Sequence, residues 1–454
     1  MRYFHPTPPL LCRRSPAPFT AKVSALALAC ALALGGCATE PGTGTPPAQP
    51  PAAPAAPAVP PSAQAVPATP AAADGHAEGF VQWRNAFVAQ ALAEGIRPDT
   101  VRNVLAQAQW QPRVIELDRS QPEFTRTPWA YLDSAVSPLR VSQGLAKLEQ
   151  HSTPLQAAAE RYGVPASVVT AIWGIESNYG SHFGTFKTVD ALATLAYEGR
   201  RHDWARSQLL AALRIIDRGD IAAEAMIGSW AGAMGHTQFI PTVFQAYAVD
   251  ADGDGRRDIW GSIPDVAAST AHFLEREGWV PGETWGTEVQ LPPGFDHARA
   301  ELSVRQSTAQ WAAEGVRAMD GNAALPDLAS ASILAPAGAR GPAFLVGKNF
   351  RTILRYNNST NYALAVALLS QRLSGGPGVV AEWPRDLQPL SREQTRQLQT
   401  ALNAKGFDTG TPDGVLGPAT RAGLRKYQQS QGLVADGYPT LELLRSLAPA
   451  GTNP

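Results

Sequence analysis

The sequence predicts a mainly α-helical protein with a small mixed β-sheet, followed by a separate C-terminal unit of three helices. From residue 78 onward, apolar residues recur at helical spacing, as at Phe80, Trp83 and Phe87, which indicates amphipathic helices. Beyond Trp279 the pattern changes to short apolar runs bounded by polar, Gly and Pro residues, which favour strands. The expected strands are 287–291, 330–334 and 343–346, with a helix from Ser307 among them.

Further helices are expected from the same spacing. They cover residues 99–105, 142–151, 154–161, 189–197, 202–218, 221–229 and 362–373. Residues 375–384 are rich in Gly and Pro and predict a linker. The main helical domain is therefore expected to span residues 78–375.

The last unit, residues 388–448, has the signals of a small helical module. Ser391 and Gln394 form a capping box, and Leu398 lies on the stripe that the first helix would bury. Pro418 suits the start of the second helix. No arrangement of acid and base groups is visible here, so we expect this unit to bind rather than to catalyse.

Length and charge set limits on function. The chain has 454 residues, enough for two or three domains. Its 38 basic and 39 acidic residues nearly balance, so no overall charge favours nucleic acid or an acidic polymer. The eight His include no His-Glu-x-x-His pair, and the three Cys cannot form a thiolate zinc site.

Residues 1–36 have the pattern of a secretory signal peptide. Arg13 and Arg14 precede a short apolar run at 23–34. The run ends in small residues before Cys37, a pattern that resembles a bacterial lipoprotein cleavage box and predicts lipidation of Cys37. The alternative is an ordinary signal peptide with a chance Cys.

Residues 37–77 are expected to link a lipid anchor to the folded protein. Residues 41–73 contain eleven Pro among 33 residues and predict an extended spacer without a core. By resemblance to lipoprotein sorting, Ala38 in place of Asp favours the outer membrane. We therefore expect a periplasmic, outer-membrane lipoprotein with several acyl chains as its anchor.

One helix contains the candidate catalytic residue. Pro165 suits its first turn and Gly180 its C-terminal end. Val169, Ile172 and Glu176 are spaced three and four apart, so the carboxylate shares a face with core-directed side chains. Burial and the negative end of the helix dipole should both raise the pKa of Glu176, as a general acid near neutral pH requires. The alternative is a structural ion pair with an Arg elsewhere.

Two other stretches carry groups suited to sugar recognition. Residues 232–242 contain two Gly three apart, which let backbone approach a ligand, and Gln238, which can donate and accept hydrogen bonds. Residues 356–362 combine Tyr and Asn, which suit the apolar faces and the hydroxyls of sugars. The alternatives are an interhelix turn for the first stretch and a polar helix cap for the second.

An acidic loop follows the calcium-loop rule over its first half. Carboxylates at positions 1, 3 and 5 and Gly at position 6 match that rule at Asp250, Asp252, Asp254 and Gly255. Position 7 would contribute the Arg256 carbonyl, but position 12 is Gly261 rather than Glu. Asp265 could substitute in a longer loop, and Asp258 could help directly or through water. The alternative is a solvated Asp- and Gly-rich turn.

Together, these motifs resemble the membrane-bound lytic murein transglycosylase B family, bacterial enzymes with a lysozyme-like core that cut peptidoglycan. The resemblance depends on four stretches in the family's order: 176–180, 232–241, the acidic loop and 356–362. It implies that Glu176 is the single catalytic carboxylate. The implied substrate contacts are Ser177, Tyr179, Gln238, Tyr356, Asn357 and Tyr362. The implied ligands of a structural calcium ion are Asp250, Asp252, Asp254, the Arg256 carbonyl and Asp265, without an organic cofactor.

The resemblance also implies the reaction and the partner. The enzyme would cleave the bond between N-acetylmuramic acid and N-acetylglucosamine and form a 1,6-anhydro sugar, without a second carboxylate. The C-terminal unit resembles the three-helix peptidoglycan-binding domain through residues 413–421 and Tyr427. Two alternatives remain open: a hydrolytic muramidase that uses Asp190, Glu198 or Asp203 as second acid, and a non-catalytic tether between outer membrane and wall.

Overall fold

The computed structural model describes residues 70–119, 126–319 and 324–447. The predicted signal peptide, Cys37 and nearly all of the spacer lie outside these residues. Among the described residues, no helix combines the length and apolar character that crossing a bilayer requires.

The chain folds first into a series of helices. They are α1 (Pro70–Ala93), α2 (Pro98–Asn103), α3 (Pro112–Arg119), α4 (Pro128–Ala135), α5 (Pro138–Gln150), α6 (Ser152–Tyr162), α7 (Ala166–Ser177), α8 (Thr188–Glu198) and α9 (His202–Arg218). Five of the nine begin at Pro, which needs no backbone donor in the first turn. α1 begins before the expected start at residue 78, since Pro70 suits the first turn of a helix and the Ala residues that follow favour helix.

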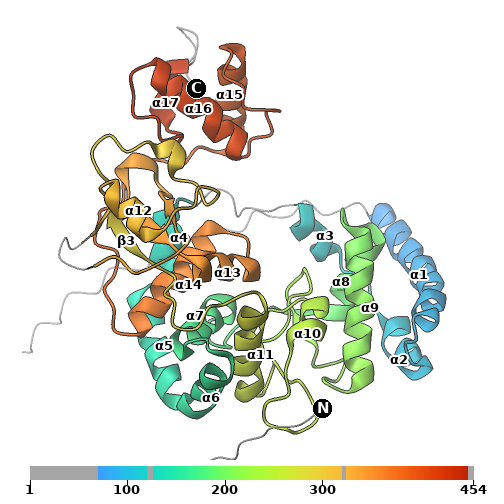
Figure 1. Ribbon diagram of the computed structural model, residues 1–454. Helices are drawn as coiled ribbons and strands as arrows, with labels where there is room; N and C mark the ends of the chain where they lie inside the picture. Colours follow the sequence, from blue (N-terminus) through green and yellow to red (C-terminus); the bar gives the residue numbers. More distant parts are fainter. Residues whose placement is uncertain (1–69, 120–125, 320–323, 448–454) are drawn as a thin grey trace, which may run out of the picture. The chain divides into compact units, whose positions relative to one another are not determined.

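Helix α7 lies at the centre of this domain. Eight of its twelve residues are buried, and it packs against α5, α6, α11 (Ile263–Arg276) and α14 (Thr360–Leu373) (Figure 1). Helix α14 is itself buried along most of its length. A helix apolar on nearly all sides is stable only inside such a core, so the position of α7 is set by its neighbours.

The remaining elements complete the domain. They are α10 (Pro241–Tyr247), α12 (Thr308–Ala313), α13 (Lys348–Tyr356), and the short 3₁₀ turns Leu105–Gln107, His297–Arg299 and Gly338–Arg340. The helix expected from Ser307 forms as α12, and the structure adds that Ser307 caps it through a capping box with Gln310.

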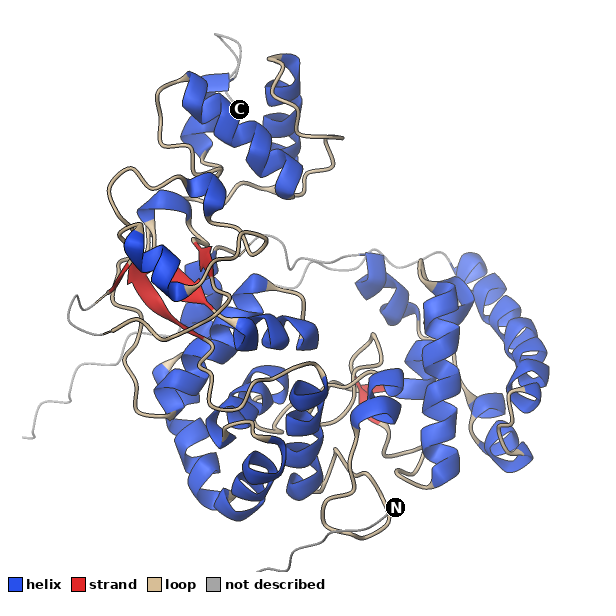
Figure 2. Ribbon diagram, viewed as in Figure 1, coloured by secondary structure: helices blue, strands red, loops and turns tan. Residues whose placement is uncertain are grey.

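Two small sheets lie within the helical domain (Figure 2). The larger has the strand order β4–β3–β6–β5, formed by Arg317–Ala318, Gly286–Gln290, Ala343–Val346 and Ser332–Leu334. The three expected strands are therefore confirmed. All strand pairs of this sheet are antiparallel, so the expectation of a mixed sheet is wrong.

The expected helix at 221–229 is wrong. This segment forms turns and strand β2 (Ile227–Gly228), which pairs antiparallel with β1 (Phe186–Lys187). Gly219, with φ of 86°, ends α9 just before it. Pairing with β1 overrides the local helix preference of its Ala residues.

The C-terminal module has a hydrophobic core of its own. Its helices are α15 (Arg392–Ala404), α16 (Pro418–Ser430) and α17 (Leu441–Leu447). Leu398, Leu402, Leu424 and Tyr427 pack together there. The capping box of Ser391 forms as expected, so the three-helix prediction is confirmed.

Candidate active site

Helix α7, which carries the candidate acid, ends in an unusual backbone conformation. α7 stops at Ser177, and Asn178, Tyr179 and Gly180 follow with φ of 48°, 58° and 82°. The sequence predicted the end at Gly180, but the left-handed region begins two residues earlier. Left-handed backbone is costly for a bulky residue such as Tyr179, so surrounding contacts must hold it.

Two contacts hold Tyr179 in place. Its hydroxyl donates to the backbone oxygen of Arg140 at 2.8 Å. Its ring packs so closely on Gly174 and Gly144 that a Cβ at either position would overlap it. The guanidinium of Arg140 also donates to the Gly174 oxygen, at 3.0 Å. These contacts fix the last turn of α7 against α5, a support that the sequence analysis missed because it depends on two helices.

Glu176 lies in that last turn and is still partly exposed. The Tyr362 hydroxyl donates to its Oε1 at 2.6 Å. Burial raises the pKa of Glu176 to about 7, against the opposite effect of the Tyr362 hydrogen bond. The predicted rise in its pKa is therefore confirmed in direction. No Arg or Lys among the described residues forms an ion pair with Glu176. The alternative, in which Glu176 is part of a structural ion pair, therefore gains no support.

Two tyrosines lie near the carboxylate of Glu176. Tyr356 and Tyr362 stack with ring centroids 6.4 Å apart and planes 13° from parallel. The Tyr356 hydroxyl donates to the Thr237 oxygen at 2.7 Å. Burial, followed by the charge of Glu176, raises the pKa of both tyrosines well above its ordinary value, so both hydroxyls stay protonated. Asn357 follows α13 and is exposed.

The Gly-rich loop lies close to the same region. Gln238 has φ of 50°, and its amide nitrogen donates to the oxygens of Gly235 and Phe183 at 2.9 and 3.2 Å. The loop is joined to the aromatic pair through Thr237, whose carbonyl accepts from Tyr356. The structure thus brings Glu176, Tyr362, Tyr356 and the Gln238 loop together.

Ser177 and Tyr179 are engaged in supporting contacts within the fold. Ser177 is buried, donates to the His236 oxygen at 2.9 Å and accepts from the Gly180 nitrogen at 3.1 Å. The Tyr179 hydroxyl is bonded to Arg140. Their assignment as substrate contacts stays a prediction, and their visible role is to shape the turn that carries Glu176.

The three carboxylates considered as a second acid have other partners. Asp190 accepts from the Gln109 nitrogen at 3.1 Å. Glu198 pairs with Arg119 at 3.0 Å, and Asp203 lies beside His202. Each belongs to α8 or α9, and none is bonded to the Glu176–Tyr362 pair in the described part of the chain.

The acidic loop gathers three of its predicted ligands. Carboxylate oxygens of Asp250, Asp252 and Asp254 lie within 4.8 Å of one another. The backbone N–H groups of Gly253 and Gly255 donate hydrogen bonds to the carboxylate oxygens of Asp250, at 2.7 and 2.9 Å. Three hard carboxylate donors on a tight turn fit a calcium ion.

The other two predicted ligands differ in setting. Asp265 is buried at the start of α11, where its two oxygens accept from the Ala251 and Asp258 nitrogens, both at 2.7 Å. Through these two hydrogen bonds, Asp265 links Ala251 near the start of the acidic loop to Asp258 near its end. The Arg256 side chain pairs with Asp254 at 2.7 Å, while the ligand expected from Arg256 is its carbonyl. Both remain predicted ligands.

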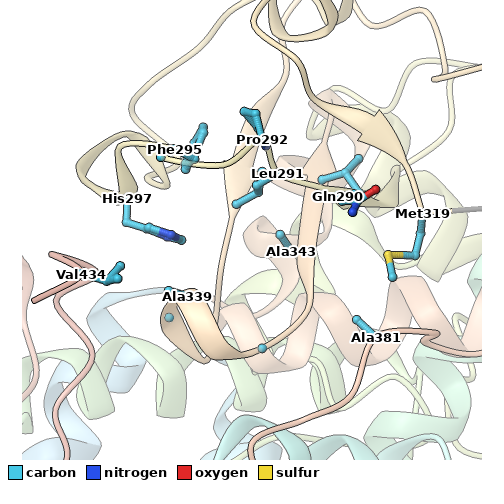
Figure 3. Close-up of a pocket in the computed structure, with 14 residues that line it drawn as sticks. Gln290, Leu291, Pro292, Phe295, His297, Met319, Ala339, Ala343, Ala381 and Val434 are labelled. Carbon is cyan, nitrogen blue, oxygen red and sulfur yellow. The ribbon is translucent and has the colours of Figure 1, made fainter. Parts of the chain in front are cut away.

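A cavity of about 370 Å³ lies at the larger sheet, away from these residues. Figure 3 shows Leu291, Phe295, Met319 and His297 on its wall. No Asp or Glu lines it, so it offers no carboxylic acid of the kind expected here and is not the candidate active site.

The fold and the site together define a class. A helical core holds one carboxylate, protonatable near neutral pH, at a helix end beside two tyrosines. One acid of this kind is what protonation of a glycosidic oxygen requires. Such a site on a helical core is typical of glycan-cleaving enzymes of the lysozyme-like class.

Comparisons with known proteins narrow this class to a family. The transglycosylase SLT domain family matches residues 79–371, and the peptidoglycan binding domain family matches residues 391–447. The membrane-bound lytic murein transglycosylase B of Escherichia coli K12 is 31% identical over 296 residues, which cover 62% of this chain and 79% of that protein.

Similar solved structures agree with this family assignment. SltB3 of Pseudomonas aeruginosa, in complex with NAG-anhNAM-pentapeptide, is 54% identical with a TM-score of 0.79, over 81% of this chain and 99% of its own. The Escherichia coli lytic transglycosylase Slt35, in complex with calcium, is 29% identical with a TM-score of 0.55, over 66% and 92%. The chain belongs to the SLT transglycosylase family and is a lytic transglycosylase that acts on peptidoglycan.

The Tyr362 contact predicts a shift in the pH dependence of activity. If Glu176 is the general acid, as predicted, it must be protonated to act, so activity should fall as the pH rises through about 7. The Tyr362 hydrogen bond lowers the pKa of Glu176, so Tyr362→Phe should raise it and move this fall to higher pH. The measurement is the pH profile of kcat on soluble glycan strands. Tyr356→Phe, which leaves the bond to Glu176 in place, is the control, and an unmoved profile in Tyr362→Phe would contradict the assignment.

Proposed function

We propose that the enzyme cleaves the β-1,4 bond between N-acetylmuramic acid and N-acetylglucosamine and leaves a 1,6-anhydromuramic acid end. The observation that carries this proposal is a single carboxylate with a pKa near 7 and no second acid bonded to its hydrogen-bond network in the described residues. Hydrolytic glycosidases generally require two carboxylates. A ring-closing reaction needs only one.

In the proposed reaction, Glu176 first acts as general acid. It gives its proton to the glycosidic oxygen as the bond to C1 of the muramic residue breaks and positive charge develops there. The carboxylate formed then takes the proton of the muramic 6-hydroxyl, whose oxygen bonds to C1. Glu176 is protonated again at the end, and no water is consumed.

The surroundings of Glu176 suit both halves of this cycle. The Tyr362 hydrogen bond stabilises the carboxylate form of Glu176, whereas burial favours the acid form. A pKa close to the working pH allows the same group to give and to take a proton.

We propose that Tyr356, Tyr362, Asn357 and Gln238 contact the sugars, and that the C-terminal module binds the wall polymer.

The products distinguish this reaction from its alternatives. Residues 78–454 incubated with purified sacculi should release muropeptides that end in anhydromuramic acid, one water lighter than hydrolysis products, as measured by mass spectrometry. Glu176→Gln should lower the rate by about 10²- to 10⁴-fold, while the variant still pellets with sacculi. Reducing ends would show a muramidase, and pelleting without release by the wild-type protein would show a tether.

We also propose that the acidic loop binds calcium as a structural ion, with Asp250, Asp252, Asp254 and the Arg256 carbonyl as ligands and Asp265 in support or as a further ligand. The grouped carboxylates support this proposal, as does the relative solved with calcium. An ion at this loop would neutralise charges that otherwise repel one another.

Calcium should therefore stabilise the fold. Removing it with a chelator should lower the melting temperature, and adding calcium at about 100 times its Kd should restore about 2.7 kcal/mol. Asp252→Asn should abolish this response, whereas Asp203→Asn, an exposed carboxylate elsewhere, should keep it. A melting temperature that ignores calcium in the wild-type protein would rule out the site.

Finally, we propose that Cys37 is acylated and anchors the enzyme to the periplasmic face of the outer membrane. The sequence pattern at 34–37 supports this, and the Escherichia coli relative is named as membrane-bound. A soluble catalytic domain on a long spacer would then reach the wall from the membrane.

Membrane fractionation of the full chain tests the anchor. Cys37→Ala should move the enzyme from the membrane fraction to the soluble fraction, because the acyl chains supply the membrane affinity. Ala38→Asp should leave it lipidated but shift it to the inner membrane. Unchanged sedimentation of Cys37→Ala would contradict the lipid anchor.

A further inference from the structure

We propose that His236 is a positioning residue for Glu176, a neutral imidazole that joins the last turn of α7 to the acidic loop. The proposal deepens the function above and rests on the role of Glu176 as the general acid. It concerns a buried His that does not itself touch Glu176.

The hydrogen bonds of the imidazole fix its tautomer. Trp173 Nε1 lies 2.7 Å from His236 Nδ1. An indole nitrogen can only donate, so Nδ1 must be the acceptor and carries no proton. His236 Nε2 then carries the proton and donates to the Trp260 oxygen at 3.1 Å. The ring is thus a bridge with one acceptor end and one donor end.

The backbone of His236 repeats the same connection. Its oxygen accepts from Ser177 Oγ at 2.9 Å, and its nitrogen donates to the Ile259 oxygen at 2.9 Å. On the α7 side, the two partners are Trp173 and Ser177, which lie three residues before Glu176 and one after it. On the other side, the two partners are adjacent residues at the end of the acidic loop. One residue therefore makes four hydrogen bonds, two on each side.

The space around the ring is filled. A Cβ at position 180 would overlap the imidazole, so Gly180 leaves room for it as well as adopting φ of 82°. Phe183 packs on the ring with centroids 4.7 Å apart, and Trp173 at 5.6 Å. The turn after α7 is thus built around His236, and a displaced ring would displace the turn.

The acidic loop holds the far end of the bridge. The Trp260 nitrogen donates to Asp258 at 2.9 Å, and the Asp258 nitrogen donates to Asp265 at 2.7 Å. Arg257, the next residue before Asp258, pairs with buried Asp220 at 2.6 Å. These bonds fix the position of Trp260, so the carbonyl that accepts the hydrogen bond from the imidazole is itself held in place.

The imidazole stays neutral over the working pH range. Burial lowers the pKa of His236 to about 4. The titratable groups that act on it are Asp258, which opposes this effect, and Lys147 and His151, which add to it. Protonation would place a hydrogen on Nδ1 opposite the Trp173 N–H, so a neutral ring keeps the bridge intact.

Two substitutions separate the ends of the bridge. In His236→Asn the amide lies near the Nδ1 position and can still accept from Trp173, but it does not reach Trp260. In His236→Gln the amide lies near the Nε2 position and can still donate to Trp260, but it leaves Trp173 without an acceptor. His151→Asn is the matched control, because His151 meets the Trp173 ring edge-on at 5.7 Å, a ring contact rather than a hydrogen bond.

The full chain with each substitution is assayed on soluble glycan strands for kcat, KM and the pH of the high-pH fall in kcat. We expect His236→Gln to lower kcat by about 10²-fold with KM changed by less than about 3-fold, as a misplaced acid would. The fall should also move to lower pH, because a loosened turn admits water to Glu176. His236→Asn should lie between His236→Gln and the wild type, and His151→Asn should match the wild type.

Three outcomes would overturn the proposal: wild-type kcat in His236→Gln, a lowered melting temperature with the pH profile unmoved, or the same profile shift in His151→Asn. If His236→Gln does not fold, His236→Asn decides, and wild-type kcat and profile in that variant overturn the proposal. Failure of the underlying function is seen separately, as reducing ends from the wild-type enzyme or activity of Glu176→Gln.

Discussion

The candidate site depends on keeping one carboxylate protonatable near neutral pH while it stays partly exposed. Burial in the last turn of α7 brings the pKa of Glu176 to about 7, while a single hydrogen bond from Tyr362 offsets part of that effect. Deep burial alone would favour the acid form only, and full exposure would favour the carboxylate only. The packing of α7 against α5, α6, α11 and α14 sets the balance between the two.

Much of this arrangement could be predicted from local sequence patterns. The helix that contains Glu176, the helix from Ser307, the capping box at Ser391 and the strand at 343–346 depend on neighbouring residues, so the sequence reveals them. The features that escaped prediction depend on distant partners. Residues 221–229 form turns and the short strand β2 rather than a helix because β1 lies beside Ile227 and Gly228. His236 is important only because Trp173 and Trp260 both hydrogen-bond to its ring.

The acidic loop also combines features that neighbouring residues determine with features that depend on distant partners. The spacing of Asp250, Asp252 and Asp254 identified a cluster that the structure does bring together. The sequence also singled out Asp265, but it could not show that both oxygens of this residue accept backbone N–H groups of the loop. Spacing gives the order of possible ligands along the chain, whereas the hydrogen bonds that already occupy each oxygen depend on how the loop closes on α11.

The left-handed backbone at residues 178–180 limits how this enzyme could be re-engineered. Three successive positive φ angles leave few residue types that fit, and Gly180 also leaves room for the His236 ring. A library randomised at these positions would consist mostly of misfolded proteins, although they adjoin the acid. The exposed segment at 357–358 carries no such constraint, so new glycan preferences are more accessible to directed evolution there.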